Sequence, residues 1–203
     1  MNIFSSLYFF LLSKIIILYL KLRGVVVDFK SNFRSFPSLT IKGVASNIII
    51  GKIQVLGKID IRNRENGKIF FEDNVKIEKD CRFVSARDGK IKIGKHSIIT
   101  MGAIINGGGN VIIGENCILG PRIVINANDH VFKKNFLIKD QGFIHKDVII
   151  EDDCWFGANV VVNKGVHIKY GSVLGASCVV TKDTEINSIN AGVPAKKISE
   201  RKT

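Results

Sequence analysis

Residues 150–186 read IEDDCWFGANVVVNKGVHIKYGSVLGASCVVTKDTEI, and every sixth position of this stretch is apolar. The seven residues with this spacing are Ile150, Phe156, Val162, Ile168, Leu174, Val180 and Ile186. A period of six matches neither the 3.6-residue period of a helix nor the two-residue alternation of a half-buried strand. It predicts a repeating architecture in which each six-residue unit directs one apolar side chain inward.

The same period continues upstream with small insertions. Three stretches are similar to successive coils: NGKIFFEDN (66–74), DGKIKIGKH (88–96) and GGNVIIGEN (108–116). Their equivalent inward residues, Phe71, Ile93 and Ile113, lie 22 and then 20 residues apart, so these coils exceed three hexads by four and by two residues. The pattern predicts a triangular coil with apolar residues stacked inside, in which glycine at the second position of the repeat allows a tight corner.

The four cysteines share one position of the repeat, four residues after an inward apolar residue. The pairs are Ile77 and Cys81, Ile113 and Cys117, Ile150 and Cys154, and Leu174 and Cys178. We expect buried thiols there, because a reduced cysteine behaves as a small apolar side chain. The sequence has no CxxC pair and no histidine at ligand spacing, so we expect neither a metal site nor disulfides, and a reduced, cytosolic protein.

The chain is strongly basic. Its 203 residues include 30 Lys and Arg against 18 Asp and Glu, which gives a formal charge of +12. This excess favours acidic partners such as phosphorylated cofactors, anionic glycan precursors or lipid headgroups. We do not expect nucleic acid as a partner, because no basic stretch alternates with aromatic residues as a base-stacking surface requires.

The first 22 residues, MNIFSSLYFFLLSKIIILYLKL, are apolar except for a lysine in the middle, Lys14. They lack the basic start and the cleavage site of a secretory signal, so we do not expect their removal. Three alternatives stay open: a helix packed on the protein or on a neighbouring subunit, a helix on the membrane surface, and a membrane span, against which Lys14 counts. The basic residues that follow slightly favour the membrane-facing alternatives; they are Lys21, Arg23, Lys30 and Arg34.

We expect one domain with two appendages. The expected parts are an apolar N-terminal helix (1–30), the coil domain (31–186) and a C-terminal cap or tail (187–203). Both appendages would cover the open ladder edges at the ends of a coil stack.

The six-residue register breaks once inside the array. It reaches Val131 and resumes only at Ile144 and Ile150, which predicts a Lys-rich extruded loop at about 131–143. His130 immediately precedes this loop at an outward-facing position, and loops on a rigid frame often form binding sites. His130 is therefore a candidate functional residue. The other histidines, which we expect at the solvated surface, are His96, His145 and His167.

An ordered set of motifs resembles one enzyme family. The set is similar to motifs of the hexapeptide-repeat acyltransferases, above all the galactoside, maltose and surface-polysaccharide O-acetyltransferases. Its members, in chain order, are ILGPRIVINANDH, KDQG in the loop, DDCWFGANVVVNKG, GSVLGASCVVTKD and AGVPAKKI. The resemblance covers roughly residues 66–198. It implies an all-β, left-handed parallel β-helix, acetyl-CoA as co-substrate, and a homotrimer with active sites between subunits.

The resemblance also implies roles for individual residues. His130 would be the general base that takes a proton from a sugar hydroxyl, so that the oxygen attacks the thioester of acetyl-CoA directly. Trp155 would lie beside the acyl and pantetheine arm, and a backbone N–H near Ala158 would bind the oxyanion. The other matches to the cofactor groove are Gly157, Gly175, Ala176, Thr181, Lys182 and Lys196, and the candidate acceptor contacts are Asn128 and Asp129.

Together these observations predict an acetyl-CoA-dependent O-acetyltransferase that acts on a sugar hydroxyl in surface polysaccharide biosynthesis. An N-acetyltransferase for an amino sugar or nucleotide-sugar and a non-catalytic scaffold stay open as alternatives. A zinc enzyme of the carbonic anhydrase type would need a close histidine pair, which this spacing does not supply. The basic charge and apolar N-terminus favour an acceptor such as a lipid-linked glycan, and a location in the cytoplasm or at the inner face of the cytoplasmic membrane.

Overall fold

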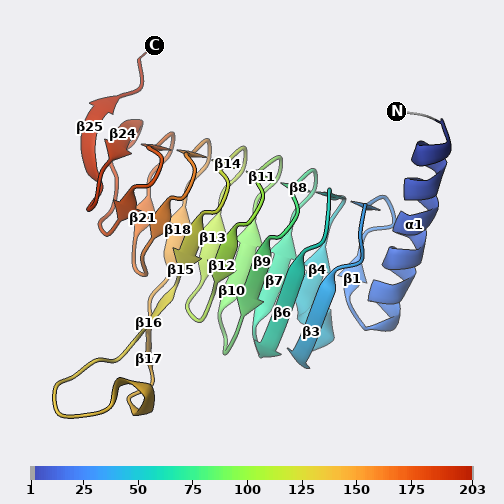
Figure 1. Cartoon of the computed structure of the whole chain (residues 1–203), viewed down its shortest axis with the longest axis horizontal. Coiled ribbons are helices and arrows are strands. Elements are labelled where there is room, and N and C mark those ends of the chain that lie inside the picture. The colour runs from blue at the N-terminus through green and yellow to red at the C-terminus, as the bar shows by residue number, and fades with distance from the viewer. Residues whose placement is uncertain (1–2, 203) are drawn as a thin grey trace.

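Short parallel strands wind into three long ladders in the computed structural model, which describes residues 3–202. Each coil contributes one strand to each ladder, and Figure 1 shows the coils stacked along one axis. The predicted all-β solenoid is confirmed. Residues 1, 2 and 203, which the expected N-terminal helix and C-terminal tail include, lie outside the described residues.

The ladders are called sheets A, B and C here. Sheet A consists, in spatial order, of β1 (Val26–Val27), β4 (Ile48–Ile50), β7 (Lys68–Phe71), β10 (Lys90–Ile93), β13 (Val111–Ile113), β18 (Val148–Ile150) and β21 (His167–Ile168). Sheet B consists of β2 (Asn32–Phe33), β5 (Gln54–Val55), β8 (Lys76–Ile77), β11 (Ile98–Ile99), β14 (Ile118–Leu119), β19 (Trp155–Phe156), β22 (Val173–Leu174), β24 (Ser188–Ala191) and β25 (Lys196–Glu200). Sheet C consists of β23 (Val179–Val180), β20 (Val161–Val162), β15 (Val124–Asn126), β12 (Ile104–Asn106), β9 (Arg82–Ser85), β6 (Asp60–Glu65) and β3 (Ser38–Gly43).

Two positions of each hexad point into the coil. The predicted position is confirmed from Ile150 to Val180, where each of the six side chains is at most 1% exposed. The second position lies two residues earlier and holds smaller residues, among them Val148, Val160 and Ser172. Because the ladders pair these positions in register, the side chains form one continuous core along the stack.

The corners between the sheets depend on two different backbone requirements. The last residue of a corner has a left-handed backbone, as at Asn116 with a φ of 57°, which Asn tolerates better than most residues. The glycine at the second position of the repeat meets a different requirement, the close approach of the next coil. A Cβ on Gly157 would lie 2.6 Å from the backbone N of Ala176, and one on Gly114 would lie 2.3 Å from Oδ1 of Asp152.

The longer coils near the N-terminus keep the predicted register. Phe71 pairs with Ile93 and Ile93 with Ile113, so the four and two extra residues are confined to the corners. The first coil already includes β1 and β2, and it therefore begins inside the segment expected to be the N-terminal helix (1–30). A short 3-10 helix, η1 (Ala45–Asn47), lies before β4.

Two inward predictions are wrong. Ile186 is 61% exposed, because the chain leaves the six-residue register after Val180 and Asn190 of β24 pairs with Leu174 instead. Ile144 is 42% exposed, because it belongs to an arm outside the coils. At this end of the stack the core ends in buried polar groups. The Ser172 Oγ and Thr184 Oγ1 atoms there lie 2.8 Å apart and form a hydrogen bond.

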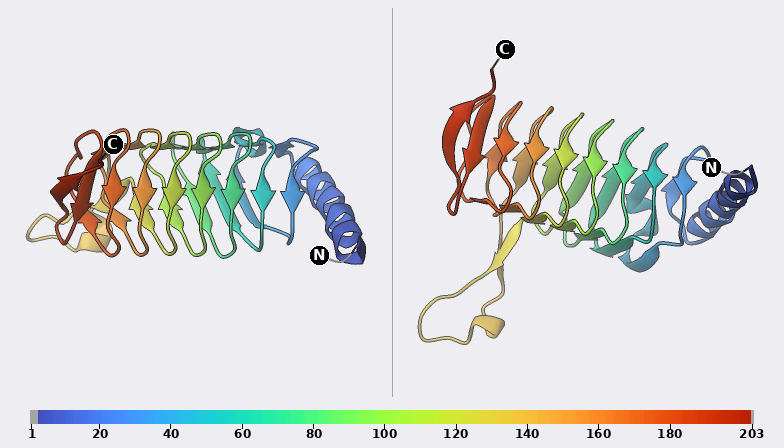
Figure 2. Two further views of the ribbon diagram at one scale, coloured as in Figure 1. Left: turned by 90° about the horizontal axis from the view of Figure 1, so that it is seen from above. Right: turned by 45° about the horizontal axis from the view of Figure 1, so that its top comes forward.

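A helix covers the opposite end of the stack. Figure 2 shows α1 (Ile3–Leu22) lying across the first coil. Ile16, Ile17 and Leu20 are at most 2% exposed. The Ser13 hydroxyl accepts a hydrogen bond from Phe33 N–H at 2.8 Å and donates one to Phe33 O at 3.0 Å. The helix thus packs on the protein, as the first of the three alternatives required.

All four cysteines are buried and free, as predicted. Three of the thiols donate a hydrogen bond to a backbone carbonyl of the next coil: Cys81 to Thr100 at 3.2 Å, Cys117 to Glu151 at 3.2 Å and Cys154 to Lys169 at 3.3 Å. Burial raises the pKa of Cys81 to about 11 and also raises the pKa of Cys178. Three of the thiols therefore join neighbouring coils, and Cys81 and Cys178 stay protonated at neutral pH.

Thiol reactivity tests this placement. In the folded protein at pH 8, alkylation of all four thiols by iodoacetamide should be about 100-fold slower or more than in the unfolded chain, because burial blocks access of the reagent to each thiol. Mass spectrometry counts the labels with and without guanidinium. Rapid labelling of any one thiol in the folded protein would show that its position is not part of the core.

Two apolar residues of the same predicted register should differ in how strongly truncation lowers the stability of the protein. Leu174→Ala should lower the free energy of unfolding by about 2–5 kcal/mol, because it leaves a cavity in the core. Ile186→Ala should change it by less than about 0.5 kcal/mol, because that side chain is exposed. Urea unfolding of both variants measures the difference, and equal losses would contradict the observed end of the core.

Candidate active site

An arm leaves the coil stack where the register breaks. β16 (Asn128–His130) and β17 (Phe143–His145) pair antiparallel and form its root, and a 3-10 turn, η2 (Ile138–Asp140), lies near its tip. Figure 1 shows the arm projecting away from the coils, in the part of the chain where the six-residue register was predicted to break. The side chain of Gln141 closes the loop, since it accepts a hydrogen bond from Lys133 N–H at 2.7 Å and donates to Phe136 O at 3.0 Å.

His130 is exposed at the root of the arm, as predicted. Its ring lies against Phe143, the residue opposite it in the β16–β17 ladder, with 4.2 Å between ring centroids. Neither ring nitrogen of His130 is hydrogen bonded to any residue that the structure describes. The imidazole is therefore held by packing while its nitrogens stay available to a substrate.

The residues beside His130 are tied to the coils. Asp129 forms an ion pair with Lys164, which follows β20 on the next coil and whose side chain is 20% exposed. Asn128 pairs with His145 across the root of the arm. Of the two candidate acceptor contacts, Asp129 thus already has a cationic partner, and its carboxylate helps to fix the strand that precedes His130.

His145 differs from the expected solvated histidine, and that prediction is wrong. Both ring nitrogens are buried and lack a hydrogen-bond partner among the described residues. A Cβ on Gly108 would lie only 2.5 Å from Nδ1 of His145. Burial, and to a lesser degree the charge of Arg87, lowers the pKa of His145, which favours the neutral imidazole. His145 is therefore a packed residue at the root of the arm.

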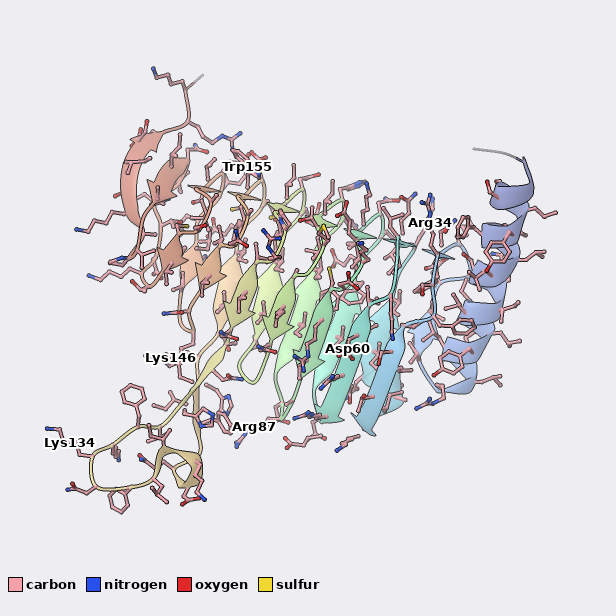
Figure 3. All side chains as sticks on the ribbon, viewed as in Figure 1. Arg34, Asp60, Arg87, Lys134, Lys146 and Trp155 are labelled. Carbon is pink, nitrogen blue, oxygen red and sulfur yellow. The ribbon has the colours of Figure 1, made fainter. Side chains whose placement is uncertain are left out.

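Trp155 lies on another sheet and faces outward, as predicted, with 54% of the residue exposed. It lines a cavity of about 190 Å³ together with Ile118, Val173 and Arg201. In Figure 3, Trp155 lies at one edge of the stack and Lys146, at the root of the arm, lies at the opposite edge. A single chain therefore does not bring Trp155 and His130 together.

The small residues predicted to line a cofactor groove stack on successive corners between sheets B and C. Gly157 and Ala158 follow β19, and Gly175 and Ala176 follow β22 one coil later. Ser177 N–H donates to Ala158 O at 2.8 Å across the two coils. The N–H of Ala158 makes no hydrogen bond within residues 3–202, so this donor is free, as an oxyanion site requires.

The predicted lysines lie near the C-terminal end. Lys182 and Lys196 line a cavity of about 250 Å³, beside which Thr181 is exposed. Lys197, which also lines this cavity, is paired with Glu185 and Glu200, whereas neither Lys182 nor Lys196 has an ion-pair partner in the described part of the chain. These two ammonium groups are available to an anionic ligand.

The structure adds two residues that the sequence analysis missed, Phe143 and Lys164. Counting hexads could not find them, because the arm shifts the numbering between contacting coils: Val124 pairs with Val161, 37 residues later. The pairing of coils across the arm could have identified Lys164. When Ile125 is paired with Val162, Lys164 comes to lie next to the strand that contains Asp129. The described residues contain no group of three or more His, Cys, Asp or Glu placed to hold a metal ion.

Comparison with known proteins places this geometry in a family. A family described as "Hexapeptide repeat of succinyl-transferase" matches residues 147–182. The dTDP-4-amino-4,6-dideoxy-D-glucose acyltransferase of Escherichia coli is 31% identical over 141 residues, which cover 64% of this chain and 70% of that protein. The chain belongs to the hexapeptide-repeat acyltransferase family. Its coil stack is accordingly the left-handed parallel β-helix of that family.

Two further members illustrate the range of this hexapeptide-repeat family. The galactoside O-acetyltransferase of Escherichia coli K12 is 33% identical over 110 residues, 54% of each chain, so the match spans about half of that relative. The structure of a hexapeptide-repeat acetyltransferase from Vibrio cholerae in complex with acetyl-CoA is 29% identical, with a TM-score of 0.52 over 66% of each chain. A protein named as an O-acetyltransferase of galactosides and one named as an acyltransferase of an amino nucleotide-sugar thus both resemble this chain.

Proposed function

We propose that this protein transfers an acetyl group from acetyl-CoA to a sugar hydroxyl, with His130 as the general base. The observation that carries the proposal is the exposed imidazole at the root of the arm, whose ring nitrogens have no partner among the described residues. One nitrogen takes the hydroxyl proton as the oxygen attacks the thioester carbonyl. The C–S bond then breaks, and the imidazolium returns its proton to the departing sulfur of CoA.

The second half of the proposed site binds acetyl-CoA. The free N–H of Ala158 would stabilise the oxyanion, and the exposed ring of Trp155 would contact the pantetheine arm. Lys182 and Lys196 would meet the phosphates of the cofactor. A resembling structure that contains acetyl-CoA supports this assignment.

The two halves lie on different edges of one chain, and we propose that a homotrimer joins them. The arm exposes large apolar side chains in the isolated protomer; Phe132 and Phe136 are each 71% exposed and Leu137 is 66% exposed. Such side chains are covered when an arm lies against a neighbouring subunit. In the proposed trimer, the arm of one subunit presents His130 to the Trp155 edge of the next.

Transfer to a sugar amine is the second candidate. Among the relatives compared above, the one matched over the largest share of its own length, 70%, is named as an acyltransferase of an amino nucleotide-sugar. The products distinguish the two reactions, because mild alkali releases acetate from an ester but not from an amide.

We place the acceptor in glycan biosynthesis in the cytoplasm or at the inner face of its membrane. A non-catalytic scaffold would instead show no thermal protection by CoA.

Loss of His130 tests the reaction. His130→Ala should lower turnover of acetyl-CoA with a panel of sugars, amino sugars and nucleotide-sugars by about 10²- to 10⁴-fold, because the hydroxyl then has no base. Release of the CoA thiol measures the rate. His96→Ala, which removes an exposed histidine from a distant corner, is the matched control and should keep normal turnover. Equal rates in His130→Ala and the control would refute the role of His130.

Mixing two variants that each lack one half of the proposed site tests whether the site is shared between subunits. His130→Ala and Trp155→Ala chains, unfolded together in equal amounts and refolded, should recover about one quarter of wild-type activity. This fraction follows because a site between two subunits is intact when one supplies His130 and the other supplies Trp155. If both residues acted from the same chain, no mixed trimer would contain an intact site and activity would stay at background.

A further inference from the structure

The outer face of α1 is an unbroken apolar stripe. Its members are Leu7, Leu11, Ile15, Leu18 and Leu22, and they are 53–78% exposed. Spacings of four and three residues place them on one side of the helix, opposite the side that Ile16, Ile17 and Leu20 bury on the coils. The stripe therefore faces away from the end of the stack, across which α1 lies in Figure 2.

Lys14, the one charge in the middle of this helix, does not interrupt the stripe. Its Nζ donates a hydrogen bond to Phe29 O at 2.7 Å and lies 3.6 Å from the centroid of the Phe29 ring. The side chain thus lies along the flank of the helix, against the first coil. Phe10 and Phe29, which are 55% and 62% exposed, extend the apolar surface on that flank.

The buried face of α1 argues against a membrane span. The segment Ser5–Leu22 is long and apolar enough to cross a bilayer by length and composition alone. A span would, however, withdraw Ile16, Ile17 and Leu20 from the core and break both hydrogen bonds between Ser13 and Phe33. A helix that keeps this packing still offers its opposite face to a partner.

The charges around this end identify the kind of partner. No Asp or Glu occurs before Asp28. Close to the helix, a cavity of about 380 Å³ is lined by basic side chains and amides and, among its described lining residues, by no carboxylate; these residues include Lys30, Asn32, Lys52, Gln54, Lys76 and His96. Asp28 and Asp73 bind the backbone N–H groups of Lys30 and Lys52, so they leave both ammonium groups without an ion-pair partner in residues 3–202.

We propose that this end of the molecule docks on an anionic lipid bilayer. The stripe of α1 lies at the boundary between headgroups and acyl chains, and Lys30 and Lys52, at the end of the cavity nearest the helix, contact lipid phosphates. A second copy of the chain is a poorer occupant, because two copies in contact through this stripe would each supply Lys14, Lys21 and Arg23 and no Asp or Glu from residues 1–27 to pair with them. The inference goes beyond the proposed acetyl transfer and does not depend on it.

Flotation with vesicles tests the proposal on the full chain, without acetyl-CoA or acceptor. The protein should bind vesicles of phosphatidylcholine with 30% phosphatidylglycerol, and high salt should weaken this binding. Leu11→Glu/Leu18→Glu, which places two charges on the stripe, should abolish detectable binding. Lys30→Ala/Lys52→Ala should lower the partition coefficient by about 10- to 30-fold.

The matched control is Lys58→Ala/Lys79→Ala, which removes two exposed lysines from another corner and should bind as the wild type does. Thermal unfolding of each variant must match that of the wild type, since all six replaced positions are exposed. Equal binding to vesicles of phosphatidylcholine alone, or equal losses in the two lysine pairs, would overturn the phosphate contact. A change in solution mass in Leu11→Glu/Leu18→Glu without any loss of vesicle binding would show that another copy covers the stripe.

Discussion

The in-register stacking of parallel coils is the constraint on which the rest of this structure depends. Neighbouring strands of a ladder lie about 4.8 Å apart, so each side chain touches its equivalents above and below. The core positions then admit only side chains that pack on those at the equivalent positions of the neighbouring coils, and the corners admit only backbones that let the next coil approach. Gly157, whose Cβ would collide with Ala176, and the thiols that bond to carbonyls of the next coil both follow from this spacing.

Much of the fold could be predicted because it repeats over short distances in the chain. Six-residue counting identified the inward positions up to Val180 except Ile144, the outward side chains of His130 and Trp155, and the arm. It misplaced Ile186, because periodicity does not report the point at which polar residues such as Asn190 take over the core. It also missed contacts between distant segments: the ion pair of Asp129, the packing of Phe143 on His130 and the burial of His145 arise where the arm joins the coils.

The rigidity that makes the solenoid predictable also prevents it from forming a deep cleft within one chain. The exposed imidazole of His130 lies at the root of the arm. The indole of Trp155 lies at another edge of the stack (Figure 3), and the free N–H of Ala158 lies in the corner after β19. Side chains on stiff ladders do not move toward each other. In the homotrimer proposed above, the edges of two molecules would meet and enclose the site that a single chain leaves open.

The crosswise position of α1 has a consequence for reach. Along sheet A, four ladder steps separate β1, beside the helix, from β13, in the coil that leads to His130. At about 4.8 Å per step, the imidazole would stand roughly 20 Å above the plane in which α1 lies. With the helix at a lipid surface, the number of coils between α1 and His130 would set the height of the imidazole above the bilayer. Sugar units next to the bilayer would lie below the imidazole, and sugar units further out on a membrane-anchored glycan would lie level with it.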